Sequence, residues 1–188
     1  MKNIAIFASG SGSNAQKIAE YFAGSDKIKV AIILTNNIDA GVIDRAKSLN
    51  IPCYLFDRVA YRNGEVLSIL TENDIDFVVL AGFLWLVPTP FIEAFPNKIV
   101  NLHPALLPKF GGKGMYGHHV HEAVIAAGET ESGITIHYVN EAYDEGAIIF
   151  QGKYKINEND SAMDIANKGQ VLEHKHFPKV IEELVLGK

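Results

Sequence analysis

The chain has 188 residues, of which 48% are hydrophobic and 21% charged, and it carries a formal net charge of −5 at pH 7. The negative charge argues against a nucleic acid or an anionic membrane as partner. The lone cysteine, Cys53, excludes an internal disulfide and a cysteine-based zinc cluster. The apolar start is too short for a secretory core, and the longest apolar run, 77–87, is about half a membrane span. We therefore expect one cytoplasmic domain over residues 1–188.

Apolar runs alternate with amphipathic stretches along the whole chain. Strands are expected at 4–8, 30–34, 53–56, 77–80 and 99–102, and helices at 14–23, 40–49, 61–72 and 118–127. This alternation predicts a parallel sheet with helices on both faces. Alternating polarity at 135–139 and 148–154 adds an antiparallel C-terminal portion. A last helix, capped by Ser161, is expected to run to 186, with Pro178 bending or interrupting it. The predicted fold is a single α/β, Rossmann-like domain with a mostly parallel, twisted sheet.

The stretch 101–109, Asn-Leu-His-Pro-Ala-Leu-Leu-Pro-Lys, ends one of these strands. Side chains two apart in a strand point the same way, so Asn101 and His103 share a face. An amide donor beside an imidazole suits stabilisation of an oxyanion, and the downstream Asp144 can orient or charge the ring. The pattern indicates acyl-type chemistry on a small carbonyl. The alternative is structural: Asn101 as a turn cap, His103 as a hydrogen-bonded core histidine and Asp144 as a turn residue.

A glycine- and serine-rich loop, 9–14, follows the first strand and precedes the first helix. Glycines let backbone N–H groups approach an anion, and the helix N-terminus favours negative charge. The spacing also fits a weak dinucleotide fingerprint, but Thr35-Asn36-Asn37 stands where that motif requires an acid. We expect a phosphate monoester here, with a dinucleotide or a purely structural turn as alternatives.

With these motifs in place, the chain resembles the folate-dependent phosphoribosylglycinamide formyltransferases over nearly its whole length. The resemblance rests on the loop at 10–14 and on the stretches 78–83, 101–109, 133–139 and 144–149. The Asn/His/Leu-Leu-Pro element is shared by several formyl-folate enzymes. The serine-rich loop and the short chain favour the glycinamide ribonucleotide branch, since methionyl-tRNA formyltransferases carry a further C-terminal domain.

The resemblance implies a role for each matching residue. Asn101, His103 and Asp144 correspond to a catalytic trio. Gly12, Ser13 and Asn14 correspond to a phosphate cradle, and Glu173 to a residue that holds the ribose, although a solvated helix face is the alternative for it. Residues implied in binding the folate are Arg58, Phe83, Leu84, Trp85, Leu86, Val87, Asn140 and Glu141.

Two departures from the family pattern stand out. Trp85 occupies a position where many relatives carry an arginine, and the connection 110–117 is several residues longer than usual. That connection contains four glycines, so we expect it to be mobile and able to close over bound substrate. His119 and His121, just after it, align with a His-x-His pair of the family.

The implied reaction transfers the formyl group of 10-formyltetrahydrofolate, a co-substrate, to the amine of glycinamide ribonucleotide. Asn101 and a protonated His103 are expected to stabilise the tetrahedral oxyanion, and Asp144 to raise the pKa of His103 and hold a proton-carrying water. Cys53 is expected to pack rather than react. The expected partners are these two small molecules, with no nucleic acid or membrane, and the protein is expected to be a monomer or a homodimer.

Three alternatives remain. A formyl-folate hydrolase or another formyltransferase would use the same trio, and a nucleotide-binding module without catalysis would not need it. A metal site at His118, His119 and His121 is disfavoured because Glu122 is the only acidic residue beside them and formyl transfer requires no metal.

Overall fold

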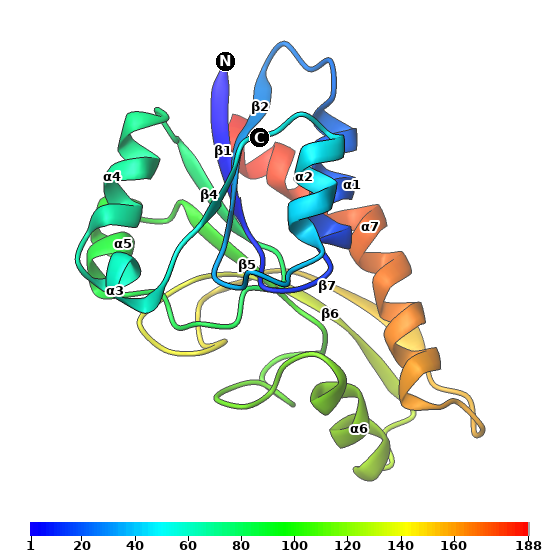
Figure 1. Ribbon diagram of the computed structural model, residues 1–188. Helices are drawn as coiled ribbons and strands as arrows, with labels where there is room; N and C mark the ends of the chain where they lie inside the picture. The colour runs from blue at the N-terminus through cyan, green and yellow to red at the C-terminus, as the bar shows by residue number, and fades with distance from the viewer. Residues whose placement is uncertain (188) are drawn as a thin grey trace.

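The computed structural model of the chain describes residues 1–187 and contains one seven-stranded sheet in the order β3-β2-β1-β4-β5-β6-β7 (Figure 1). Strands β1 to β5 run parallel, whereas β6 and β7 pair antiparallel at one edge. The predicted sheet, parallel with an antiparallel C-terminal portion, is confirmed. The strands are β1 (Lys2–Phe7), β2 (Ile28–Thr35), β3 (Cys53–Leu55), β4 (Phe77–Leu80), β5 (Ile99–His103), β6 (Glu131–Tyr138) and β7 (Ile148–Lys155).

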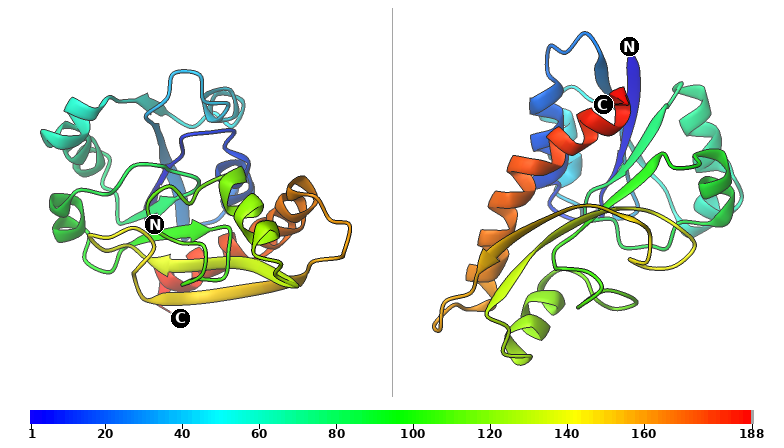
Figure 2. Two further views of the ribbon diagram at one scale, coloured as in Figure 1. Left: turned by 90° about the horizontal axis from the view of Figure 1, so that it is seen from below. Right: turned by 180° about the vertical axis from the view of Figure 1, so that it is seen from behind.

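Helices cover both faces of the sheet, as the near-continuous apolar strands require. In Figure 2, right, α7 and α1 lie on one side of the strands and α4 and α5 on the other. Each layer has its own core: Ile18 and Phe177 pack on one face, Tyr61 and Leu70 on the other. The helices are α1 (Ser13–Phe22), α2 (Val42–Ser48), α3 (Arg58–Arg62), α4 (Glu65–Glu72), α5 (Thr89–Ala94), α6 (His118–Ala126) and α7 (Ala162–Leu186).

The structure corrects the helix expected at 61–72. It is two helices, α3 and α4, separated at Gly64, which has a φ of 92° that a residue inside an α-helix cannot have. The first of them begins earlier than expected because Asp57 caps it, accepting hydrogen bonds from two backbone N–H groups. The sequence analysis also missed α5, a six-residue helix too short for its periodicity to be recognised.

Ser161 caps helix α7 as predicted, with a full capping box to Asp164. Pro178, which was expected to bend or interrupt the helix, does not interrupt it, because the helix continues to Leu186. Phe177, Pro178 and Ile181 are buried against the sheet, and this packing holds the helix where a backbone hydrogen bond is lost. Within residues 1–187, none of the helices has the length together with the apolar character that crossing a membrane requires.

Candidate active site

A cleft of about 580 Å³ opens at the carboxyl ends of β4 and β5, where open parallel sheets place their ligands. Segments far apart in the sequence meet there: the start of α1, the loop after β4, the end of β5, the glycine loop 110–117, α6, the end of β6 with the loop that follows it, and the first half of α7. The residues that line it and carry the argument below are Asn14, Phe83, Leu84, Trp85, Leu86, Val87, Asn101, His103, Gly112, His121, His137, Ala142, Tyr143, Asp144, Gln170 and Glu173.

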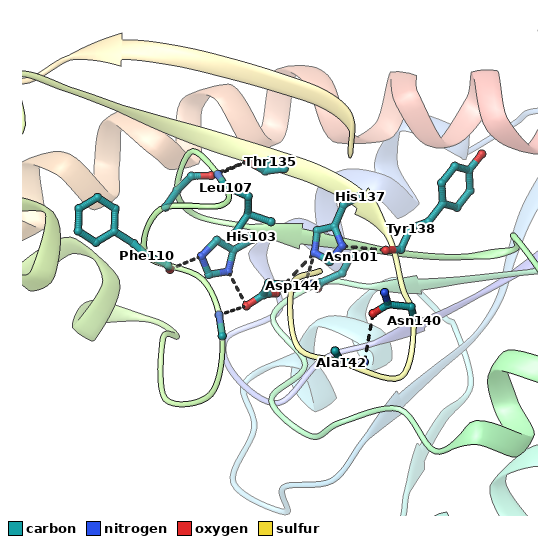
Figure 3. Close-up of polar contacts among 12 residues, drawn as sticks. Asn101, His103, Leu107, Phe110, Thr135, His137, Tyr138, Asn140, Ala142 and Asp144 are labelled. Carbon is teal, nitrogen blue, oxygen red and sulfur yellow. Dashed lines mark hydrogen bonds and ion pairs between the residues drawn. The ribbon is translucent and has the colours of Figure 1, made fainter. Parts of the chain in front are cut away.

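The structure brings Asn101, His103 and Asp144 together on one wall of this cleft (Figure 3). Asn101 and His103 project from the end of β5, and Asp144 comes from the loop after β6. The Asn101 amide lies 3.4 Å from Asp144 Oδ1, and His103 Nδ1 lies 3.5 Å from Asp144 Oδ2. A single carboxylate therefore faces both an amide donor and an imidazole.

Loop geometry fixes the position of Asp144. Its backbone is left-handed, with a φ of 57°, a conformation that aspartate tolerates better than most residues. The Gly112 N–H donates to Asp144 Oδ2 at 3.0 Å. Nearby, a side chain at Gly146 would lie 1.6 Å from the Tyr138 carbonyl oxygen, so the chain can turn here only with glycine. Asp144 therefore does lie in a turn, as its structural alternative proposed. The same turn places its carboxylate in the lining of the cleft.

His103 is almost fully buried, at 3% exposure. Burial lowers the pKa of its imidazole below the ordinary value, although Asp144 and the Phe110 carbonyl act in the opposite direction. The sequence analysis expected Asp144 to raise the pKa of His103. Its charge does act in that direction, but the desolvation that accompanies burial outweighs it. Both ring nitrogens nevertheless face acceptors, since Nε2 lies 2.7 Å from the Phe110 carbonyl oxygen. A proton that His103 gains during a reaction would therefore be stabilised, because each ring nitrogen has an acceptor beside it.

The pKa of the Asp144 carboxyl is lowered, even though its burial alone would raise it. The contacts with His137 and His103 and the Gly112 N–H together outweigh that burial. Asp144 is therefore ionised at neutral pH, and the pair enters any reaction as a carboxylate beside a neutral ring.

His137 is the member of the cluster to which the sequence analysis gave no role. It lies on β6 directly opposite Asn101 in the antiparallel register, and its Nε2 is 3.1 Å from the Asn101 amide nitrogen. Its Nδ1 lies 2.9 Å from the Tyr138 carbonyl oxygen, which can only accept, so Nδ1 carries the proton and Nε2 accepts from Asn101. His137 therefore orients the amide. The cross-strand register was the missing signal, because periodicity alone does not reveal which strands pair.

The predicted phosphate loop joins β1 to α1, and Gly12 is its tightest point. A Cβ at Gly12 would lie 2.4 Å from the Val42 side chain. Within residues 1–187, the N–H groups of Ser13 and Asn14 donate to no protein acceptor, so they remain open at the helix N-terminus. The Asn14 side chain lines the cleft and donates to Glu173 Oε2 at 2.6 Å.

Glu173 lies on α7 and faces the same end of the cleft, so the solvated helix face considered for it is not its environment. Burial raises the pKa of its carboxyl, with the hydrogen bond from Asn14 acting in the opposite direction. Asn14 Oδ1 is buried and, among the described residues, has no hydrogen-bond partner. A buried acceptor left unpaired beside a carboxyl suits a ligand that carries hydroxyl groups.

Residues expected to form the folate pocket fall into two groups. The segment 83–87 lines the cleft throughout, with Phe83 anchored in the core, and its contact with a folate stays a prediction. The Arg58 guanidinium stacks over the Trp85 ring, 4.4 Å from its centroid, outside the cleft lining. Asn140 and Glu141 also lie outside the lining, where Asn140 accepts a hydrogen bond from the Ala142 N–H and Glu141 is exposed. Ala142 and Tyr143 line the wall at that point instead.

The His-x-His pair that follows the glycine loop is divided between two environments. His121 is buried, lines the cleft and has an unpartnered Nδ1 among the described residues, whereas His119 is exposed. Burial, together with the nearby His103, lowers the pKa of His121. Cys53 is half-buried on β3, and burial raises the pKa of its thiol, which agrees with a packing role.

Comparison with known proteins identifies a family for the chain. A family model described as formyl transferase matches residues 2–181. The chain is 34% identical to a phosphoribosylglycinamide formyltransferase of Bacillus subtilis over 98% of its own length and 95% of the relative's. It is 41% identical to the chloroplastic enzyme of that name from Arabidopsis thaliana over 96% of its own length, and it spans 64% of that relative.

Solved structures lead to the same family. The crystal structure of a phosphoribosylglycinamide formyltransferase from Bacillus halodurans shares 39% identity with a TM-score of 0.88, covering 98% of this chain and 95% of that one. A glycinamide ribonucleotide transformylase from Symbiobacterium toebii gives a TM-score of 0.90 at 31% identity, covering 100% of this chain and 89% of that one. The chain belongs to the formyl transferase family.

Proposed function

We propose that this protein transfers the formyl group of 10-formyltetrahydrofolate to the primary amine of glycinamide ribonucleotide, a step of purine biosynthesis. The observation that carries the proposal is the position of the Asn101, His103 and Asp144 cluster. The cluster shares one cleft with Asn14, beside the open N–H groups at the start of α1, and with the apolar segment 83–87. The start of α1 suits a phosphorylated sugar and the apolar segment suits a flat aromatic ring. The names of the relatives agree with this reading.

The nucleotide would bind at the end formed by the loop and α7. Gly12, Ser13 and Asn14 would hold its phosphate through the open N–H groups at the start of α1. Glu173 and the unpartnered Asn14 Oδ1 would accept hydrogen bonds from the ribose hydroxyls. These contacts would place the amine end of the substrate toward Asn101.

The folate would bind against the wall formed by Phe83, Leu84, Trp85, Leu86 and Val87. The loop between β6 and β7 closes the opposite side, with Ala142 and Tyr143 in the lining and Asn140 and Glu141 beside them. Because Arg58 is held over Trp85, its charge would lie near the rim, where an anionic part of the folate would emerge.

The chemistry is a direct attack of the amine nitrogen on the formyl carbon. A carbon–nitrogen bond forms to the nucleotide, the formyl oxygen becomes an oxyanion, and the bond to the folate nitrogen then breaks. Asn101 would donate one amide N–H to the oxyanion, since its existing contact with Asp144 is long, at 3.4 Å. Losing one such donor costs about 3–4 kcal/mol in the transition state.

The proton on the attacking nitrogen must reach the leaving nitrogen. A neutral His103 would take it, and the resulting imidazolium would be stabilised by Asp144 and the Phe110 carbonyl and would in turn stabilise the oxyanion. Returning the proton to the folate nitrogen releases tetrahydrofolate and restores the neutral ring. This sequence uses no covalent enzyme intermediate and no metal.

Mixing the purified protein with 10-formyltetrahydrofolate, with and without glycinamide ribonucleotide, tests the proposal through release of tetrahydrofolate. We expect release only when the nucleotide is present. Release at equal rates without it would indicate a hydrolase, and binding of nucleotide without any release would indicate a non-catalytic module. The Ser13→Ala/Asn14→Ala double variant supplies a matched control, for which we expect a raised KM for the nucleotide and an unchanged KM for the folate.

A further inference from the structure

Three side chains with metal-binding atoms lie together at the start of α6, outside the cleft lining. One ligand atom each from His118, His119 and Glu122 lies within 4.8 Å of the other two, and all three residues are exposed. His119 Nδ1 is 3.7 Å from Glu122 Oε2, and the rings of His118 and His119 are 4.0 Å apart between centroids. The group combines imidazole nitrogen and carboxylate oxygen on one short stretch of helix.

Helical spacing explains why this group forms without His121. Residues 118, 119 and 122 fall on one side of an α-helix, since positions three and four apart are neighbours on its surface. The other side carries Val120 and Val124, which are buried, and His121, which faces the cleft. The sequence analysis considered His118, His119 and His121 as one group. Because His121 lies on the other side of the helix, the third residue of the cluster is Glu122 instead.

We propose that His118, His119 and Glu122 bind one divalent transition-metal ion of the zinc class. Imidazole suits zinc, nickel, cobalt and copper, whereas magnesium and calcium prefer sites made of oxygen alone. The three protein ligands leave a fourth position of a tetrahedral ion to water. The inference concerns a site separate from the proposed reaction and does not depend on it.

The distances allow such an ion with side-chain rotation alone. Tetrahedral zinc with bonds of 2.0–2.1 Å holds its nitrogen and oxygen ligands about 3.4 Å apart. The contact between His119 and Glu122 is already close to that value, and the exposed His118 ring can approach without disturbing the core. The positive end of the helix opposes a cation, but at an exposed site this weakens binding by no more than about fivefold. The Glu122 carboxylate offsets part of that effect.

The site has a structural consequence for the cleft. His118 directly follows Gly117, and the segment 112–117 lines the cleft. An ion bridging His118 to His119 and Glu122 would fix the point where the glycine loop joins α6. The other end of the loop is already held by Phe110 and Gly112 through His103 and Asp144, so metal binding would restrain the loop at both ends.

Titration of the metal-free full-length protein with Co²⁺ tests the proposal, because the visible absorption of cobalt reports nitrogen coordination independently of enzyme activity. Zn²⁺ competition and calorimetry then give stoichiometry and affinity. We expect one saturable equivalent, no response to Mg²⁺, and binding at least tenfold weaker in His118→Gln and in Glu122→Gln.

The matched control is His176→Gln, a histidine on α7 stacked on Phe150, which should bind cobalt as the unchanged protein does. Because the substituted ligands are exposed, thermal melting should confirm that every variant is folded. The proposal is overturned if the unchanged protein shows no saturable cobalt spectrum, or if the His118→Gln/His119→Gln double variant retains the same affinity.

Discussion

The two glycine-rich loops of the cleft use glycine for different reasons. In the loop 9–14, Gly12 lies against Val42, the Gly10 carbonyl accepts from the Val42 N–H, and Arg45 donates to the Ser11 carbonyl. The loop is therefore packed onto α2, and glycine is required because no side chain fits. In the loop 110–117, by contrast, a Cβ at Gly112, Gly114 or Gly117 would meet nothing within 4 Å.

Those three glycines are required by backbone conformation alone, since each has a positive φ, as Gly12 also does. The second loop is held by hydrogen bonds to His103 and Asp144, and it is packed only at Gly111 among its glycines, where a Cβ would lie 2.5 Å from Leu107. A preformed anion cradle therefore faces a loop whose position depends on the proposed catalytic residues. The expected mobility of the second loop, and its closure over substrate, follow from this contrast and remain predictions.

The largest expected effect comes from Asp144→Asn, which removes the charge beside His103 while keeping the shape of the side chain. Because a neutral amide cannot stabilise the imidazolium, we expect formyl transfer to fall about 100- to 1,000-fold. The affinity for glycinamide ribonucleotide should change little, since the packed loop 9–14 is untouched. Steady-state kinetics and nucleotide binding by calorimetry measure the two effects. An equal loss of formyl transfer and of nucleotide affinity would show that the loops 9–14 and 110–117 are not independent.

The Gly12→Ala variant tests the packed loop. The added methyl meets Val42 at 2.4 Å and the backbone there is left-handed, so overpacking and strain add together. We expect the free energy of unfolding to fall by about 2–4 kcal/mol, measured by urea denaturation. An unchanged stability would contradict the assignment of this loop as preformed and rigid.

Gly114→Ala is the matched change in the second loop. Space is open around Gly114, so only the cost of a positive φ remains, and we expect a loss of about 1 kcal/mol. The same urea series measures it. A loss as large as that of Gly12→Ala would indicate that the second loop is as tightly packed as the first.

The smallest effect concerns pH. His121 is buried with a lowered pKa, so below pH 6.5 the unfolded chain binds a proton that the folded protein does not. Stability should therefore fall as pH decreases from 6.5 to the folded pKa of His121, by at most about 1.4 kcal/mol per pH unit for this group. The free energy of unfolding, measured by urea denaturation, should depend less steeply on pH over this range in His121→Phe than in the unchanged protein. Above pH 7.5 the two proteins should show the same dependence. Equal slopes below pH 6.5 would contradict the burial of a neutral ring.

The sequence was informative where local patterns decide the structure. Apolar runs located the strands, Ser161 located the start of α7, and the polar residues at the end of β5 located the cleft. It was less informative where distant segments meet. His137 joins the cluster through a cross-strand register, and Asn14 meets Glu173 across 159 positions of the chain. Neither contact leaves a periodic signal in the sequence.

The charge of His103 shows a further limit. Asp144 was expected to raise the pKa of the ring, but burial decides the net direction of that pKa, and burial is a property of the packed fold. The break at Gly64 has a similar origin, because a single glycine inside a helical pattern is often tolerated and only its positive φ shows that the helix has ended.

The central claim is that Asn101, His103 and Asp144 act together on the formyl group, with the amide at the oxyanion and the carboxylate acting through the imidazole. A double-mutant cycle with Asn101→Ala, Asp144→Asn and the double variant tests it most directly, through kcat/KM for nucleotide-dependent release of tetrahydrofolate. Residues that act together are not additive. We predict that the double variant is about as slow as the slower single variant. Independent, additive losses in the double variant would contradict the account.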